Sequence, residues 1–204
     1  MATISTDTPS AALASPASLL PRPKRADAVR NYDKVVAAAR EAFSERGAST
    51  SLEEIARRAG VGIGTLYRNF PNRQALLEAV YVGEVEDVSR SVAEFGQLEP
   101  FEALSGWLHR LVGYLRTKQA LAAELLDYVE RDSLLFQSCR STLFQAGEPL
   151  LARAQRAGVI RPDTNVDEVI QLVGGIAKIA NIDEGQMEHL VGIAIDGLRY
   201  TPAG

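Results

Sequence analysis

Apolar residues recur every three or four positions along most of the chain, with breaks at glycine or proline. This spacing is typical of amphipathic α-helices, whereas half-buried β-strands show alternating apolar and polar residues. Because alternation never extends beyond a few residues, the pattern predicts an all-α protein of about nine helices. The expected helices cover residues 35–47, 51–59, 63–70, 72–95, 101–117, 118–131, 133–157, 165–181 and 184–200.

Residues 51–73 have the pattern of a helix, a tight glycine turn and a second short helix. Ser51 can cap the first helix while Glu54 reaches back to the Ser51 amide, which together make a capping box. Gly60 stands where the chain must turn sharply and a positive φ is favoured. The apolar positions of the two helices are Leu52, Ile55, Ala56, Ala59, Val61 and Leu66. This spacing indicates a helix-turn-helix, whose second helix enters the major groove of DNA.

The flanking residues extend this motif. Residues 35–47 form an amphipathic helix that ends at a glycine and would pack on the helix pair. Together with the run Thr65-Leu66-Tyr67-Arg68-Asn69-Phe70-Pro71-Asn72-Arg73, residues 28–80 closely resemble the N-terminal domain of TetR-family transcriptional regulators. Beyond residue 80 the resemblance is limited to the helical architecture. Ala-rich helical hairpins also occur in proteins that never bind DNA, but three adjoining helices followed by this run favour DNA binding.

The first 25 residues are rich in Ser, Thr, Ala and Pro and have no periodicity, which predicts disorder. They end in the basic segment 21–25, which suits either a solvated tail or an arm that enters a DNA minor groove. With the resemblance, the sequence predicts a disordered arm (residues 1–25), a helix-turn-helix head (26–72) and a helical body for ligand binding and dimerisation (73–204).

The formal charge of −4 is unevenly distributed. Residues 22–73 hold 11 Lys/Arg and 6 Asp/Glu, a balance of +5, whereas residues 74–204 hold 11 Lys/Arg and 19 Asp/Glu, a balance of −8. Asp7 accounts for the remaining unit. A basic head on an acidic body attracts phosphate at one end of the molecule only.

The resemblance places the recognition helix at about residues 63–70, with Thr65 and Tyr67 directed towards DNA. Tyr67 is expected on a phosphate or a thymine methyl group. Asn69 offers a paired donor and acceptor to a base, most naturally adenine. Leu66 and Phe70 are expected in the core of the head.

Other candidate contacts have two explanations. Ile63 suits a thymine methyl group or packing beneath the turn, and Arg68 suits a phosphate or a solvated surface. Arg73, beside the free amides at the start of the next helix, would form a phosphate site. Thr50 and Ser51 would clamp another phosphate, unless Ser51 is fully occupied as a cap.

The chain departs from the family pattern at Gly62, where a Ser or Thr usually caps the recognition helix. Gly62 and Gly64 leave this helix start short of side-chain donors. They stay within the candidate DNA-binding surface, but sequence readout would rest more on Tyr67, Asn69 and DNA shape.

Few residues suit metal or redox chemistry. The one cysteine, Cys139, excludes an internal disulfide and a Cys-based zinc site, and it fits a reducing cytoplasm. His109 and His189 are too isolated for a metal cluster. No apolar run approaches the roughly 18–20 residues that cross a bilayer, and Pro16 interrupts a stretch that only superficially resembles a signal peptide. We expect a cytoplasmic protein without metal, cofactor or membrane contact.

The middle helices of the body carry aromatic side chains, and in the TetR family the corresponding helices enclose an inducer pocket. Trp107, Tyr114 and Tyr128 are the first candidates because each joins an apolar body to a polar tip. Core packing is the competing explanation. Asp127 or Glu124 would suit a cationic ligand, although an exposed helix face explains them equally well. The candidate contacts of an unidentified, largely apolar effector are Trp107, Leu111, Tyr114, Tyr128, Phe136 and Cys139.

One recognition helix covers only a few base pairs, so useful specificity needs two heads on a two-fold operator. The last two expected helices carry apolar stripes that would form a four-helix bundle with those of a second copy. Gly174 and Gly175 would permit close helix contact, although each glycine within a helix costs about 1 kcal/mol of stability relative to alanine. Alternatively, both stripes are intrachain core. The candidate interface residues are Val166, Ile170, Val173, Gly174, Leu190, Val191, Ile195 and Leu198.

These expectations combine into a homodimeric DNA-binding transcriptional regulator, a repressor that a small-molecule effector releases from its double-stranded operator. A helical enzyme that uses the body cavity is one alternative, but no nucleophile–base pair, Gly-rich phosphate loop or metal-ligand spacing supports it. A protein-binding adaptor with a helix-turn-helix-like head is another. We predict no catalytic residue.

Overall fold

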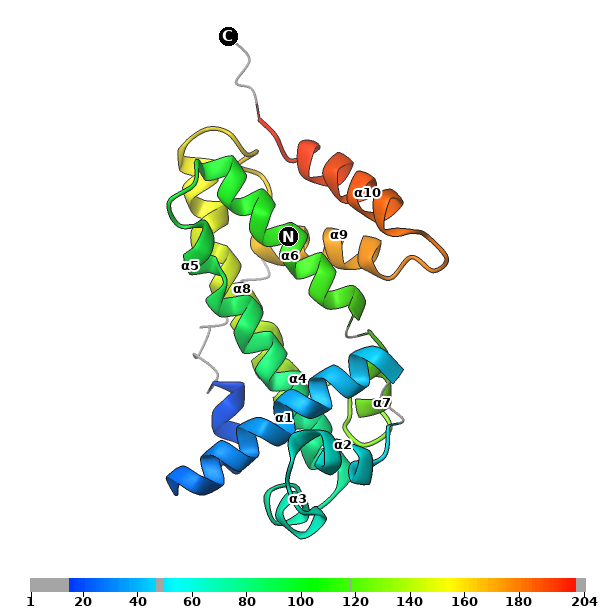
Figure 1. Ribbon diagram of the computed structural model, residues 1–204. Coiled ribbons are helices and arrows are strands. Elements are labelled where there is room, and N and C mark those ends of the chain that lie inside the picture. The colour runs from blue at the N-terminus through cyan, green and yellow to red at the C-terminus, as the bar shows by residue number, and fades with distance from the viewer. Residues whose placement is uncertain (1–14, 47–49, 118, 201–204) are drawn as a thin grey trace, which may run out of the picture.

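The computed structural model describes residues 15–46, 50–117 and 119–200, and this part of the chain is helical throughout (Figure 1). Nine α-helices have seven or more residues, α5 is a single turn and η1 is a 3-10 turn, which confirms the all-α prediction for these residues. The elements are η1 (Pro16–Leu19), α1 (Ala26–Arg46), α2 (Leu52–Ala59), α3 (Ile63–Asn69), α4 (Arg73–Arg90), α5 (Val92–Phe95), α6 (Pro100–Thr117), α7 (Gln119–Leu125), α8 (Leu134–Arg156), α9 (Val166–Ala177) and α10 (Glu184–Asp196).

Helices α1 to α3 form the head at one end of the molecule (Figure 1). Gly60 ends α2 in the left-handed conformation (φ 65°), as its position in the sequence predicted. Helix α1 begins nine residues earlier than the periodicity suggested, and its expected terminal residue Gly47 lies outside the described residues. The buried apolar side chains of the head are Tyr32, Val35, Ala38, Ala39, Ala42, Phe43, Ile55, Ala56, Leu66 and Phe70.

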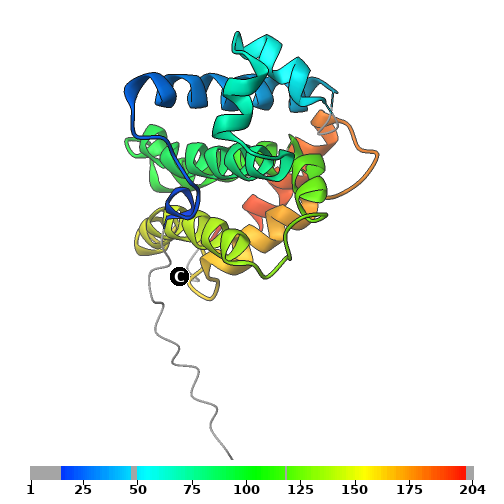
Figure 2. The same ribbon diagram turned by 90° about the horizontal axis from the view of Figure 1, so that it is seen from below.

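Helix α4 connects the head to the body. It contacts α1 on the head side and α8 on the body side, and Figure 2 shows these three helices in successive layers. The buried residues of head and body belong to one continuous cluster that runs along α4. The head is therefore packed onto the body through a shared core and is not joined to it by a flexible linker.

The connector is shorter than the sequence pattern indicated. We expected one helix to about residue 95, but α4 ends at Arg90 and the separate turn α5 follows. The carbonyl of Val88 accepts bonds from the buried Ser91 hydroxyl (2.6 Å) and from the Trp107 indole N–H (3.2 Å). These two donors satisfy a carbonyl that would otherwise bond to the next turn, so the helix can stop here.

Part of the N-terminal arm is ordered, which differs from the expected disorder of residues 1–25. Residues 1–14 lie outside the described part, but η1 packs against α4 and α8 with Pro16 buried (Figure 2). Arg22 then pairs with Asp33 at 2.8 Å and lies over the Tyr32 ring. Compositional reasoning missed this because one buried proline and one ion pair leave no periodic signal.

Three helices of the body end earlier than expected. Helix α7 stops at Leu125 instead of about residue 131, α9 at Ala177 instead of 181, and α10 at Asp196 instead of 200. Residues 199 and 200 instead pair with the turn after α8: Ile160 and Arg199 form an isolated antiparallel bridge, and the Tyr200 amide donates to Val159 O at 3.1 Å. Among the described residues, no helix is both long and apolar enough to span a bilayer.

Candidate nucleic-acid interface and body cavity

The recognition helix α3 is only seven residues long, so its position depends on the residues that anchor it. Leu66 and Phe70 are 0% and 1% exposed, as the sequence predicted, and the Phe70 ring lies 4.7 Å from that of Tyr32 on α1. On the opposite side Ile63 and Tyr67 are 41% and 44% exposed. Two large apolar side chains on the surface of so short a helix are suited to an external partner.

The start of α3 carries two glycines and therefore few side-chain atoms on its surface. Gly62 precedes the helix without a side-chain cap, as expected from its departure from the family pattern, and Gly62 O accepts from the Thr65 and Leu66 amides. A Cβ atom at Gly62 or Gly64 would meet nothing within 4 Å. Packing inside the protein therefore does not require these two glycines, and both remain open to a close approach by a DNA backbone.

Two polar side chains of α3 bond back to Thr65. Arg68 Nη2 donates to Thr65 Oγ1 and Asn69 Nδ2 donates to Thr65 O, both at 2.9 Å. The exposed Arg68 can release its bond and extend towards a phosphate. Asn69 is half-buried and uses one of its two amide N–H donors, so its remaining N–H and its oxygen are available for the predicted base contact.

Arg73 does not form the open phosphate site that we expected. Its Nε donates to Glu124 Oε1 at 2.6 Å and its Nη1 to Thr50 O at 2.7 Å, while the guanidinium carbon lies 5.7 Å from the centre of the Phe43 ring. The side chain thus joins the start of α4 to the head on one side and to α7 of the body on the other. The sequence showed the charge of Arg73 but not Glu124, its partner 51 residues away.

The residues before α2 are also engaged within the protein. Thr50 is buried, and its hydroxyl lies 3.4 Å from Ala42 O. Ser51 accepts from the Glu54 amide at 3.3 Å, so the side chain acts as the predicted cap. A phosphate clamp at this point would require both hydroxyl groups to change partners.

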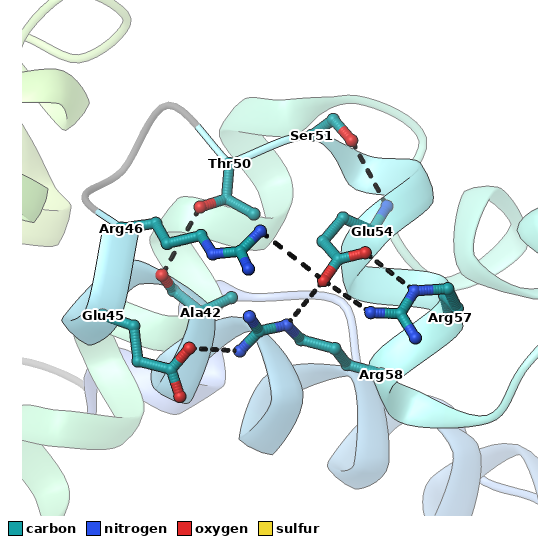
Figure 3. A network of polar contacts seen from close by, with 8 residues as sticks. All are labelled: Ala42, Glu45, Arg46, Thr50, Ser51, Glu54, Arg57 and Arg58. Atoms are coloured by element: carbon teal, nitrogen blue, oxygen red, sulfur yellow. Dashed lines mark hydrogen bonds and ion pairs between the residues drawn. The ribbon is translucent and has the colours of Figure 1, made fainter.

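The second half of the predicted capping box is wrong, because the Glu54 carboxylate turns towards arginines instead of the Ser51 amide (Figure 3). Oε2 and Oε1 accept from Arg57 and Arg58, and Arg58 also pairs with Glu45 of α1 at 2.8 Å. The hydrogen bonds from Arg57 and Arg58 lower the pKa of Glu54 to about 2. The network fixes α2 against the end of α1. Because α3 follows α2 directly, these contacts also help to orient the recognition helix.

The contacts of Arg73 lead to a prediction that separates its two possible roles. If Arg73 acts mainly through Glu124, then Arg73→Gln, Glu124→Gln and the double variant should change operator affinity by about the same factor, because each removes the same pair. If Arg73 contacts phosphate, only the variants that lack Arg73 should lose affinity, with a salt slope lower by about one. Fluorescence anisotropy at several salt concentrations measures both. Arg68→Gln, on the exposed side of α3, is the matched phosphate-contact control.

A cavity of about 720 Å³ lies in the body, between α4, α6, α7, α8 and α9. Of the six predicted effector residues, Tyr114 and Phe136 line it. Trp107, Leu111 and Cys139 lie in the core and Tyr128 is exposed, so these four do not line this cavity. Burial raises the pKa of the Cys139 thiol to about 12, which keeps it protonated and unreactive.

One cavity residue that sequence reasoning missed is Tyr81 of α4. Its ring contacts that of Phe136 edge-on with centroids 5.3 Å apart, and its phenol bonds to that of Tyr114. Burial raises the pKa of Tyr81 to about 12. Because Tyr81 follows the apolar periodicity of α4, the sequence could only indicate that it faces the body.

Most of the interface residues predicted on α9 and α10 are turned towards the interior of the same chain. Val173, Val191, Ile195 and Leu198 are buried inside the chain, and Val166 packs partly against the core. Ile170 and Gly174 line the cavity, so of the candidate residues Leu190 is the one left on the outer side. A second stripe lies on the outer side: Leu172 on α9, Ile179 just after this helix and Ile193 on α10 are 45%, 45% and 56% exposed, and Ile176 and Leu190 beside them are half-buried.

Comparisons with known proteins agree with this architecture. Residues 35–80 match the family model described as bacterial regulatory proteins, tetR family, and residues 99–200 match that of the SbtR-like transcriptional regulator C-terminal domain. A TetR transcriptional regulator from Streptomyces coelicolor is 39% identical over 83% of this chain and 99% of its own, with a TM-score of 0.72.

Two further relatives extend the comparison. The TetR regulatory protein from Mycobacterium vanbaalenii is 34% identical, with a TM-score of 0.69, over 87% of this chain and 99% of its own. The curated HTH-type transcriptional regulator UidR of Escherichia coli is 26% identical over 140 residues, which are 65% of this chain and 70% of UidR. Both family models describe regulatory proteins, and all three relatives are transcriptional regulators.

Proposed function

Because this chain belongs to the TetR family of DNA-binding transcriptional regulators, which are not enzymes, we propose that it is a homodimeric repressor released from its operator by a small molecule that enters the body cavity. DNA binding through the helix-turn-helix head follows from the family. The dimer and the response to a ligand are the parts proposed here.

The observation that carries the ligand response is the position of α7. Gln119 and Ala122 on this helix line the cavity, while Glu124 on the same helix pairs with Arg73 at the start of α4. A ligand that displaces α7 would therefore act directly on the residue that also bonds to Thr50 of the head. Such a ligand weakens DNA binding only if it binds the DNA-incompetent arrangement better than the competent one.

The proposed dimer rests on the solvent-exposed stripe of α9 and α10. Leu172 and Ile176 lie one turn apart on α9, Ile179 follows just after the helix, and Leu190 and Ile193 lie on α10, which packs against α9. Gly175 lies exposed within this stripe, and a Cβ atom there would meet nothing in its own chain. A second copy related by a two-fold axis would cover the stripe with its own and place two recognition helices on one operator.

Filling the cavity with a side chain tests the ligand response without knowledge of the ligand. Ala122→Trp would place a large ring in the cavity from α7, whereas Ala123→Trp puts the same ring on the exposed side of α7. We expect Ala122→Trp to weaken operator binding by about 5- to 150-fold, the usual range of allosteric coupling, and Ala123→Trp to bind as the unaltered protein does.

Operator affinity is measured by fluorescence anisotropy with DNA from upstream of the gene, and folding and dimer content by circular dichroism and sedimentation. A folded, dimeric Ala122→Trp variant with unaltered operator affinity would contradict the proposed route through α7. Should Ala122→Trp not fold, the smaller Ala122→Leu is measured in its place under the same criterion.

A further inference from the structure

The cavity beside α7 has an apolar, largely aromatic inner wall. Tyr114 is buried there and Tyr81 is half-buried, and their phenols are bonded to one another, so both rings present mainly carbon to the cavity. Phe136 lies against Tyr81. The remaining apolar lining residues are Leu115, Ala122, Leu126, Phe144 and Ile170. This wall suits a hydrocarbon or aromatic group, which gains free energy when it leaves water.

The rim of the same cavity is charged, with more cations than carboxylates. Its basic residues are Arg131, Arg140 and Lys178, and its acidic residues are Asp132 and Asp167. The rim therefore has a net charge of +1, although residues 74–204 together have a balance of −8. A local excess of positive charge in an acidic body favours an anion at this point.

Two cationic side chains at the rim, Arg140 and Lys178, have N–H donors that could bind a ligand. Arg140 bonds through Nη2 to Asp167 at 2.9 Å and lies over the Phe144 ring, 5.0 Å from its centre. This position orients a planar guanidinium that has further N–H donors for a carboxylate. Lys178, just after the end of α9, forms no ion pair within residues 15–46, 50–117 and 119–200, and the same holds for Arg131.

We propose that the effector of this cavity is an amphipathic carboxylate, with one negatively charged head at the rim and an aromatic or aliphatic body against the inner wall. The carboxylate binds at one of two rim cations, Arg140 beside the start of α9 or Lys178 just after its end, and Tyr81, Tyr114 and Phe136 contact the apolar part. The inference rests on the proposed function only in taking this cavity as the effector site. It replaces the largely apolar effector expected from the sequence with one that has a defined charge.

Three probes of one shape and different head groups test this assignment. Phenylbutyrate, phenylbutanol and phenylbutylamine share the same aromatic body and carry a negative, a neutral and a positive head at neutral pH. Isothermal titration with the full chain should show phenylbutyrate binding at least about tenfold more tightly than the alcohol. The amine should bind most weakly, because the rim repels it.

Charge-removing variants locate the head group. Of Lys178→Gln and Arg140→Gln, the variant that removes the head-group contact should lower phenylbutyrate affinity about three- to tenfold while leaving the affinity for phenylbutanol nearly unchanged. Arg156→Gln removes the same charge from an exposed position on α8 outside the cavity and should change neither affinity. Equal losses for the acid and the alcohol would mean that the variants disturb the cavity and do not remove a contact to the head.

The assignment is overturned if the amine or the alcohol binds as tightly as the acid, or if none of the three binds at millimolar concentration. It is also overturned if the preference for the acid survives in both Gln variants. A separate measurement of operator binding with saturating phenylbutyrate distinguishes this inference from the proposed function. Binding that depends on Lys178 but leaves operator affinity unaltered would support the ligand class and contradict the ligand-released repressor.

Discussion

Ile193→Glu is expected to yield a folded monomer that binds its operator far more weakly than the unaltered protein does. Ile193 is 56% exposed on α10, so a glutamate there meets water in the single chain and costs little. In the proposed dimer the two-fold axis would bring two such carboxylates into the apolar interface, at a cost of several kcal/mol. Without the second head the protein loses the gain from two linked sites, about 10²- to 10⁴-fold in affinity.

Val173→Glu is the matched control on the opposite face of the same helix pair. Val173 is 0% exposed, so a glutamate there buries an unpaired charge within the chain and should unfold the body. Sedimentation velocity and circular dichroism distinguish a folded monomer from an unfolded chain. If Ile193→Glu remains a dimer at micromolar concentration, this face of α10 is not the dimer interface.

Phe70→Ala should lower the free energy of unfolding by about 3–5 kcal/mol, as is usual when a buried phenylalanine is truncated. Phe70 is 1% exposed and stacks on Tyr32 of α1, and with Leu66 it is one of two buried side chains that fix α3. Helix α3 has seven residues and is too short to persist without these contacts. We therefore expect operator binding to be lost together with stability.

Tyr67→Ala, three residues earlier, should weaken operator binding without lowering the stability of the protein. Tyr67 is 44% exposed, so its removal should change the free energy of unfolding by no more than about 0.5 kcal/mol. It should still weaken operator binding by about 1–3 kcal/mol if the ring contacts DNA as predicted. Urea unfolding and anisotropy titrations on both variants measure the two quantities. Unaltered operator affinity in Tyr67→Ala would remove this residue from the DNA-binding surface.

The head could be predicted from the sequence because its determinants are local. The cap at Ser51, the positive φ at Gly60 and the buried pair Leu66 and Phe70 each follow from residues within one or two turns of each other. One exception is the Glu54 carboxylate, which bonds to Arg57 and Arg58 instead of the Ser51 amide, and another is Arg73 at the start of α4. Its charge suggested a phosphate, but its partner Glu124 is brought near only by the packing of α7 against α4.

The body was less predictable because its helices are apolar on more than one side. On α9, Val169 and Val173 are buried, whereas Leu172 is 45% exposed and Ile176 is half-buried, and both pairs have helical spacing. Periodicity alone cannot decide which stripe is internal, so several of the interface residues chosen from the sequence are buried within the chain. The cavity has the same difficulty, since Tyr81 looks like a core residue until five helices are assembled around it.

The burial of Trp107 gives the protein an intrinsic optical reporter. It is the one tryptophan of the sequence, it is 0% exposed, and the aromatic ring fits against Gly147 so closely that a Cβ atom there would lie 2.7 Å from Cζ3. Its emission therefore arises from a single dry environment between α6 and α8 and should shift to longer wavelength when the body unfolds. Since head and body share one core along α4, the fluorescence transition and the loss of helical signal should coincide in denaturant.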